Sequence, residues 1–261
     1  MKIIEIKKYW ETAGQEFPKK TLTTPTSRDY YLSLLERNNI FLHLKKHHRA
    51  LEMGCGAGTH SIYYAAKVKI LCAIDIAESL IKIAQSNASR NKIKNINFNV
   101  CSVLNLHQMF EKEFFDCIIS QRCLINLPEW QYQKKALLIA HQLLKRGGLF
   151  ILSEGFQSEI MNLNQVRKKF GLHEIKVVNY NKNFNRTAFE KFITPYFNIV
   201  DIRDYGAYLF FSRVFYPLTV FPDEPKHSSR YNKIAMKISS SIHLSGFEKY
   251  SYNLFYVLQK K

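Results

Sequence analysis

The stretch Leu51-Glu52-Met53-Gly54-Cys55-Gly56-Ala57-Gly58-Thr59-His60 decides the fold that we predict for this chain. It is typical of the end of a buried strand that turns sharply into a helix beginning near Thr59. Glycine adopts a positive φ at little cost and lets another molecule approach the backbone closely. The first turn of a helix directs free N–H groups and the positive end of the helix dipole toward such a turn. The stretch therefore predicts a turn at which a ligand meets the backbone.

The glycines of this turn follow a G-x-G-x-G pattern, and Glu52 lies two residues before the first of them. Dinucleotide-binding turns have the wider spacing G-x-G-x-x-G. The tighter spacing resembles the first motif of the class I S-adenosylmethionine-dependent methyltransferases. A glycine-rich turn in another α/β protein is the alternative.

Length and composition set bounds on the chain. Its 261 residues, 46% of them hydrophobic, allow one large domain or a core with an insertion. A run of about 18 apolar residues is absent, and the N-terminus lacks the pattern of a signal peptide. We expect a cytoplasmic protein without a membrane partner, either a monomer or a homodimer.

Cysteines and histidines show no spacing that indicates a ligand set. The five cysteines are scattered without a C-x-x-C pair, and the nine histidines form no metal-like cluster. We expect free, mostly buried thiols, no disulfide framework and no metal site.

The formal net charge is +17. A basic surface attracts nucleic acid, anionic lipid or a phosphorylated substrate. An AT-rich genome also enriches lysine, so the charge alone leaves these alternatives open.

From residue 49 onward, segments typical of strands alternate with segments of helical periodicity. Strands are expected at 49–53, 70–75, 96–100, 115–120 and 149–153, and helices at 59–67, 77–90 and 129–144. This alternation predicts a parallel sheet with helices on both faces, and ligands bind such sheets at the carboxyl ends of the strands. Gly147-Gly148 is expected to end the helix at 129–144 as a C-cap.

The segments that flank this core are less regular. Residues 1–48 are interpreted as a lid or arm, irregular over 1–26 and helical over 28–37 with Ser27 as the cap. Further elements are expected as helices at 158–170 and 187–194 and as strands at 175–180, 197–205 and 251–258. Residues 207–249, aromatic and basic with a helix near 230–242, form an insertion. The core domain then comprises 49–206 and 250–261.

Two further features support the resemblance to class I methyltransferases. Asp75 ends the second strand, where a carboxylate can accept hydrogen bonds from both hydroxyls of a ribose. The strand at 115–120, the long helix after it and the run LLKRGGLFILSE resemble the LKPGG-containing stretch of that family, with Arg146 in place of the proline. The family implies an α/β, doubly wound, mixed seven-stranded sheet of order 3-2-1-4-5-7-6 with strand seven antiparallel. It also implies S-adenosyl-L-methionine as methyl donor and S-adenosylhomocysteine as product.

The resemblance further implies, position by position, which residues line the cofactor. They are Glu52, Gly54, Cys55, Gly56, Gly58, Asp75, Ile76, Ser102, Val103 and Gln121. Ser102 stands where the family often has an acid that accepts from the adenine amino group, and a hydroxyl is a weaker acceptor than a carboxylate. Arg28 is either a clamp for the carboxylate of the cofactor or a solvated helix charge.

Candidate catalytic residues are predicted by residue type. Glu154, His60 and His227 are candidates for the base that a hydroxyl acceptor needs, and the sequence does not choose among them. Arg122 follows the fourth strand, where donor and acceptor should meet. It either binds an anionic group of the acceptor or pairs with Glu154.

The insertion is expected to build the acceptor pocket. Tyr208, Arg213 and Arg230 are its candidate substrate-binding residues, and the alternative is an aromatic mini-core with solvated arginines. The fourth strand ends in S-Q-R-C and not in the (D/N)-P-P-(Y/F) run of adenine and glutamine methyltransferases. A Cys-Pro dipeptide, which would suggest a cytosine C5 nucleophile, is also absent. The run R-C-L-I-N-L resembles a subgroup of bacterial small-molecule methyltransferases.

These observations lead to one main hypothesis and two alternatives. The main hypothesis is O-methylation of a small anionic metabolite, phosphorylated or nucleotide-linked, such as a precursor of a surface polysaccharide. An RNA methyltransferase is the first alternative, because of the net charge. A non-catalytic binding module on the same fold is the second.

Overall fold

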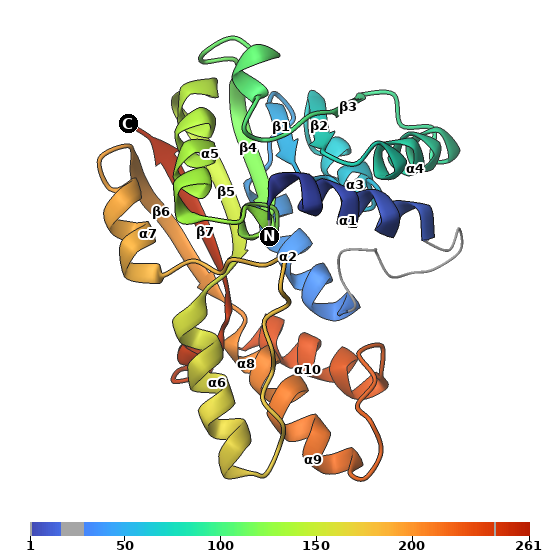
Figure 1. Ribbon diagram of the computed structural model, residues 1–261, viewed down its shortest axis with the longest axis vertical. Coiled ribbons are helices and arrows are strands. Elements are labelled where there is room, and N and C mark those ends of the chain that lie inside the picture. The colour runs from blue at the N-terminus through green and yellow to red at the C-terminus, as the bar shows by residue number, and fades with distance from the viewer. Residues whose placement is uncertain (1, 17–28, 243) are drawn as a thin grey trace.

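The computed structural model describes residues 2–16, 29–242 and 244–261. Within them, seven strands form one sheet of order β3-β2-β1-β4-β5-β7-β6 (Figure 1). The strands are β1 Arg49–Met53, β2 Ile70–Asp75, β3 Ile96–Val100, β4 Phe115–Gln121, β5 Leu144–Gly155, β6 Phe197–Asp204 and β7 Asn253–Lys260. β7 runs antiparallel to its neighbours β5 and β6, and the other pairs are parallel. The predicted fold class and strand order are confirmed.

Helices cover both faces of this sheet (Figure 1). They are α1 Ile3–Glu16, α2 Tyr30–His43, α3 Ser61–Ala65, α4 Glu78–Arg90, α5 Trp130–Leu143, α6 Gln157–Lys169, α7 Arg186–Ile193, α8 Gly206–Phe210, α9 Tyr216–Val220 and α10 Arg230–Ser241. One core joins the sheet to α5 and α7, and a second core joins it to α2, α3, α4 and α8. Along β4, Ile118 enters the first core, whereas Cys117 and Ile119 enter the second. Burial on both faces explains why these strands are continuously apolar.

The N-terminal segment differs from the prediction, because residues 3–16 form a helix and not an irregular arm. Ile6, Trp10 and Gly14 are its buried positions, and α1 packs against α4. The spacing of four residues places all three on one face of the helix. The polar residues between them conceal this narrow stripe in the sequence.

The cap of α2 is also corrected. Asp29, and not Ser27, is its N-cap, and the Asp29 Oδ1 atom accepts a hydrogen bond from the backbone N of Leu32 at 3.0 Å. An aspartate is an equally favourable cap. Ser27 lies outside the described residues, and so does Arg28, which the sequence analysis proposed as the cofactor clamp.

Gly147-Gly148 does not cap α5. The helix ends at Leu143, and β5 begins at once with Leu144 opposite Phe115. The next paired residue of β5 is Leu149, opposite Cys117, so the glycines lie in a bulge of the strand. Gly147 has a φ of +73°, and a Cβ atom at Gly148 would lie 2.9 Å from a backbone oxygen of Lys145. The glycines therefore serve a tight turn inside β5.

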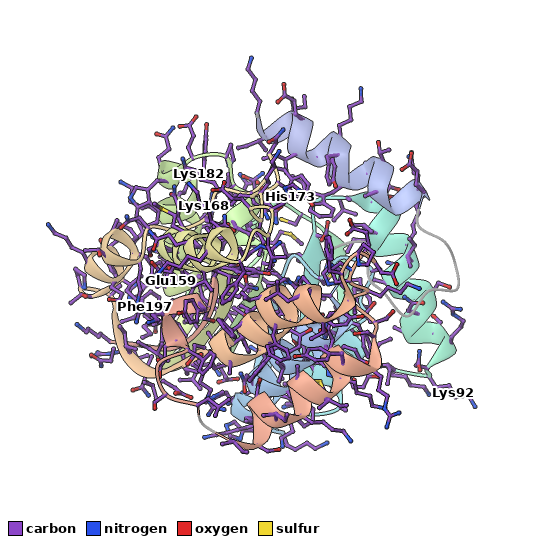
Figure 2. The ribbon with its side chains drawn as sticks, turned by 90° about the horizontal axis from the view of Figure 1, so that it is seen from below. Lys92, Glu159, Lys168, His173, Lys182 and Phe197 are labelled. Atoms are coloured by element: carbon purple, nitrogen blue, oxygen red, sulfur yellow. The ribbon has the colours of Figure 1, made fainter. Side chains whose placement is uncertain are left out.

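The strand expected at 175–180 is not formed. This part of the chain between α6 and α7 is irregular and, in the described structure, joins no sheet. His173 and Lys182, labelled in Figure 2, mark its course. Its apolar residues line a cavity instead of pairing with a strand.

The expected helix near 230–242 is confirmed as α10, which packs against α2 and α8. Much of the rest of 207–249 is also helical, in α8, α9 and a π-helical turn between them. No helix in the described part of the chain is long and apolar enough to cross a membrane.

Candidate active site

A cavity of about 500 Å³ lies at the carboxyl ends of β1, β2 and β4. One end is lined by the glycine turn and the ends of β2 and β3, with Gly54, Asp75, Ile76, Ser102 and Val103. The other end is lined by Gln121, Arg122, Asn126, Arg213, His227 and Asn253. α1 and the 175–183 segment also contribute to its wall. In Figure 1 both pass in front of the sheet, on the viewer's side.

The three glycines of the turn are required by backbone and packing. Gly54, Gly56 and Gly58 have φ values of +72°, +53° and +71°. A Cβ atom at Gly54 would lie 2.6 Å from Cys123 Sγ, and one at Gly58 would lie 2.8 Å from the Cβ of Ala84 in α4. Gly54 lines the cavity, whereas Gly56, Gly58 and Cys55 lie behind the wall. Gly56, Gly58 and Cys55 therefore support the turn from the side that faces away from the cavity.

Asp75 joins this turn to the cavity. Its Oδ2 accepts a hydrogen bond from Gly56 N at 2.9 Å, and its Oδ1 accepts one from Ala77 N at 3.0 Å. Burial raises the pKa of the carboxyl, whereas these backbone hydrogen bonds lower it. Burial is the larger effect, so the pKa is raised. Each carboxylate oxygen keeps acceptor capacity toward the cavity. Two such oxygens, side by side and held by the backbone, fit a pair of vicinal hydroxyls.

Glu52 lies beneath the turn and does not line the cavity. It is buried, and its Oε2 accepts a hydrogen bond from Ser61 Oγ at 2.5 Å. Burial raises the pKa of this carboxyl to about 7. The structure thus places Glu52 as a support between β1 and α3 and not against a ligand.

Ser102 and Gln121 line the cavity from its two ends. Ser102 Oγ accepts a hydrogen bond from Leu104 N at 3.3 Å and can still donate. Gln121 accepts from the Tyr64 hydroxyl at 3.1 Å and donates to Glu36 at 2.9 Å. These partners determine the orientation of the Gln121 amide.

Glu154 has structural partners on both of its oxygens. Oε1 accepts from Ser120 Oγ at 2.6 Å and from the backbone N of Cys123 and Leu124 at 3.1 and 3.0 Å. Oε2 accepts from Ile125 N at 3.3 Å. The side chain is buried, does not line the cavity, and has a pKa raised by burial to about 7. This geometry argues against the general-base hypothesis for Glu154, which instead holds the loop after β4.

Arg122 does not pair with Glu154. Its Nη2 lies 3.0 Å from Oε2 of Glu36, a residue of α2 that is fully buried. The guanidinium lines the cavity, and the backbone of Arg122 has a φ of +51°. The sequence-based expectation of a cation at this edge is met, but with a partner 86 residues away in the chain.

The two histidine candidates lie in different surroundings. His60 does not line the cavity, and its Nε2 is 2.9 Å from Ser33 Oγ. Burial, with Arg122 and Arg37 nearby, lowers the pKa of His60 to about 3, so it is a poor proton acceptor at neutral pH. His227, in the loop before α10, does line the cavity. Of the three candidate bases, only His227 reaches the site.

Of the candidate substrate residues of the insertion, one lines the cavity and two do not. Arg213 lines the cavity and forms an ion pair with Asp29. Tyr208 is fully buried behind it and donates its hydroxyl to Asp29 Oδ1 at 2.7 Å. Arg230 lies apart from the cavity, in a shallow hollow with Tyr31 and lysines of α10. We therefore withdraw Tyr208 and Arg230 from the acceptor site.

Comparison with known proteins identifies the family. Residues 44–193 match a family model described as a methyltransferase domain. The chain belongs to this family. It carries an S-adenosylmethionine-dependent methyltransferase domain on the class I fold.

Relatives of this methyltransferase domain share only part of the chain. A methyltransferase of Bacillus subtilis, YcgJ, described as uncharacterized, is 23% identical over 152 residues, which cover 55% of this chain and 58% of that protein. A tRNA/tmRNA (uracil-C(5))-methyltransferase of Sulfurimonas denitrificans is 48% identical over 48 residues, which cover 18% of this chain and 13% of that protein. The chain thus spans between 13% and 58% of the length of these two relatives.

Among solved structures, a phosphoethanolamine N-methyltransferase of Haemonchus contortus is similar, with a TM-score of 0.66 and 13% sequence identity. The similarity covers 98% of this chain and 48% of that one, which holds phosphoethanolamine and S-adenosylhomocysteine. At this identity the likeness establishes the shared fold.

Three aromatic side chains that line the cavity were not predicted from the sequence. Tyr9 and Trp10 of α1 line the cavity together with Tyr180 of the 175–183 segment. The ring of Tyr9 lies 5.0 Å from that of Trp10 and 4.4 Å from that of Tyr180. These aromatic contacts join α1 to the 175–183 segment beside the cavity. The spacing of Ile6 and Trp10 was the one local signal for them.

Proposed function

We propose that this chain transfers the methyl group of S-adenosylmethionine to a hydroxyl of a small molecule that carries a negative charge. The observation that carries this proposal is the cavity of about 500 Å³, which has Asp75 and His227 in the same wall. Small-molecule sites commonly have volumes of about 300–1,000 Å³. Donor and acceptor must share this space, so the acceptor is small.

In this proposal the end of the cavity near the glycine turn holds the cofactor. Asp75 accepts from the ribose hydroxyls, Gly54 lies against the methionine part, and Ile76 packs on the adenine with Val103. Ser102 is the side chain available to the adenine edge. The cofactor supplies a methyl group that is already activated by a positively charged sulfur, so the protein chiefly positions the acceptor and excludes water.

At the other end, His227 is proposed as the base. With the cofactor bound, its imidazole would take the proton that the acceptor hydroxyl gives up on methylation, and S-adenosylhomocysteine would be the leaving product. Asn126, Asn181 and Asn183 also line the cavity and offer hydrogen bonds to a polar acceptor. An in-line displacement of this kind needs no metal, and the described residues contain no cluster that would hold one.

We propose that the acceptor is negatively charged because one lysine and two arginines line the cavity. Arg122, Lys176 and Arg213 line the cavity. Arg122 is compensated by Glu36, and Arg213 by Asp29. Lys176 is thus the cation that we assign to the acceptor, which favours a single negative charge over the phosphate or nucleotide group proposed from the sequence.

The test is methyl transfer from radiolabelled S-adenosylmethionine to a cell extract that is separated into small molecules, RNA and protein. We expect label in the small-molecule fraction with the wild-type chain and none with Asp75→Ala. Label confined to RNA or protein would contradict the proposal. Binding of S-adenosylhomocysteine without any transfer would identify a non-catalytic module.

An RNA methyltransferase is the second candidate, favoured by the net charge of +17 and by the local match to a uracil-C(5)-methyltransferase. It predicts label in RNA and an affinity for mixed RNA that falls steeply with salt, because phosphate contacts release counterions. Absent or salt-insensitive binding would dismiss it.

A further inference from the structure

A buried carboxylate lies directly behind the acceptor end of the cavity. Glu36 of α2 is fully buried and does not itself line the cavity. Its Oε1 accepts hydrogen bonds from Ser153 Oγ at 3.0 Å and from Asn253 Nδ2 at 2.8 Å. Its Oε2 accepts one from Gln121 Nε2 at 2.9 Å and pairs with Arg122 Nη2 at 3.0 Å. Both oxygens are satisfied, as a charge at this depth requires.

Three of these four partners line the cavity. Gln121 is the last residue of β4, Arg122 follows it, and Asn253 begins β7. Without this carboxylate, the side chain of each of these residues would have several rotamers available at the end of its strand. Because one carboxylate holds all three, the polar wall of the acceptor site is oriented by a buried residue of α2 that does not itself line the cavity.

The backbone of Arg122 is held in an unusual conformation. A φ of +51° is uncommon for a residue with a Cβ atom. Arg122 N donates to Ser153 O at 2.8 Å, and Arg122 O accepts from Asn126 Nδ2 at 2.7 Å. Such conformations persist where the surroundings hold them, and they cluster at functional sites.

The guanidinium of Arg122 is only partly engaged. It has five N–H donors, and the described contacts to Glu36 and to Ser33 Oγ, the latter at 3.5 Å, both use Nη2. The covered Nε–H has no acceptor among the described residues. Buried donors without acceptors are rare in folded proteins. The side chain is 20% exposed and lines the cavity, so the terminal N–H groups that these contacts leave free are suited to a hydrogen-bond acceptor on a ligand.

We propose that Glu36 is the positioning residue of the acceptor site, and that it makes Arg122 a neutralised hydrogen-bond donor to an uncharged oxygen of the acceptor, such as a carbonyl or hydroxyl. A buried carboxylate at 3.0 Å cancels the net charge of Arg122, so a phosphate would not find a free cation there. The negative charge of the acceptor is then met elsewhere in the cavity. This inference rests on the proposed function.

The test is a double-mutant cycle with Glu36→Gln, Arg122→Met and the combined variant, assayed by label transfer to the small-molecule fraction at a temperature where all variants are folded. We expect Glu36→Gln to lower the rate by about 100-fold, the size of effect that a small misplacement of reacting groups produces. Its affinity for S-adenosylhomocysteine should be unchanged, because its partners lie at the other end of the cavity. In the Arg122→Met background the same change should lower the rate by a smaller factor than it does alone, because the part of its effect that acts through Arg122 is already lost.

Inorganic phosphate serves as a charge probe in the same assay. We expect it to inhibit Glu36→Gln, in which Arg122 is an uncompensated cation, more strongly than the wild type, in which Lys176 is the uncompensated cation of the cavity. Ile193→Ala, a change in the core on α7, is the control for lost stability, and it should transfer methyl at the wild-type rate and be inhibited by phosphate to the same extent as the wild type.

Three results would overturn the inference. The first is methyl transfer by Glu36→Gln at the wild-type rate. The second is that Glu36→Gln and Arg122→Met lower the rate independently of each other. The third is that phosphate inhibits the wild type and Glu36→Gln equally. If the wild type binds S-adenosylhomocysteine but labels no small molecule, the proposed function fails first and the positioning role falls with it.

Discussion

Asp75 is the residue whose role depends most directly on local backbone. Gly56 and Ala77 donate their N–H groups to its two oxygens, so the carboxylate has one orientation relative to the cavity. This arrangement requires a glycine turn next to the end of β2, and both are visible in the sequence.

Replacing Asp75 by Asn should weaken binding of S-adenosylhomocysteine by about 10- to 100-fold, as expected for lost hydrogen bonds to a charged group. The amide also places a donor against one of the two backbone N–H groups. Titration calorimetry measures the effect. Glu78→Gln, an exposed acid three residues later, is the matched control and should bind as the wild type does. Equal affinities for Asp75→Asn and the control would refute the assignment.

Glu154 is expected to contribute to stability and not to chemistry. Glu154→Gln replaces one acceptor oxygen by an amide donor facing buried N–H groups, and should lower the free energy of unfolding by about 1–3 kcal/mol. Denaturant unfolding measures this, with Glu111→Gln at an exposed site as control. A variant of normal stability that has lost methyl transfer would restore the general-base hypothesis.

The lowered pKa of His60 makes a prediction about acid stability. The folded state takes up this proton only near pH 3, whereas an unfolded histidine takes it up near pH 6.5. The unfolded state therefore binds more protons between these values, and stability falls as the pH falls through this window. At pH 5 the loss due to His60 is about 2 kcal/mol. Unfolding curves at pH 7.5 and 5 should show a smaller loss for His60→Asn, while the exposed control His173→Asn should lose as much as the wild type.

At the scale of elements, α1 and the 175–183 segment form a wall that no single strand or helix of the core provides. Trp10 packs with Ala57 and Leu80, next to the glycine turn, and its ring lies 5.3 Å from that of Tyr180. The two segments are about 170 residues apart in the chain and meet beside the cavity. We expect them to be ordered further when a ligand fills the site.

Trp10 offers a direct measurement of this wall. In a Trp130→Phe background Trp10 is the remaining tryptophan, and S-adenosylhomocysteine should change its fluorescence. In a Trp10→Phe background Trp130, which packs against Phe184 and Phe192 away from the cavity, should not respond. A response from Trp130 alone would place the ligand elsewhere.

At the scale of the whole molecule, one cluster of basic residues lies apart from the cavity. Arg230, Lys233 and Lys237 lie around a hollow between α2 and α10 and do not line the site. A small acceptor does not reach this surface, whereas a nucleic acid would extend across it.

Reversing these three charges to glutamate therefore separates the two candidate substrates. Transfer to the small-molecule fraction should remain at the wild-type rate, and its salt dependence should be the same as that of the wild type. If the substrate is RNA, the same variant should lose affinity and show a shallower salt slope. A loss of transfer to the small-molecule fraction would indicate that Arg230 binds the acceptor after all.

The sequence by itself determined the fold and the donor. Strand and helix periodicity, the glycine turn and Asp75 are local patterns, because side-chain direction and backbone conformation repeat over a few residues. They predicted a parallel sheet with helices on both faces and the edge at which the cavity lies, whereas the order of the strands was implied by the family resemblance. They also placed Gly54, Asp75 and Arg122 near that edge, although they did not separate residues that line the cavity from those behind it.

Only the tertiary structure decided the partners of these residues. Arg122 pairs with Glu36 and not with Glu154, and Arg213 pairs with Asp29, in each case across long stretches of chain. The helix α1 was missed because its buried stripe is narrow and needs α4 to be recognised. Charge compensation and enclosure depend on which side chains folding brings within a few ångströms, and no local pattern contains that information.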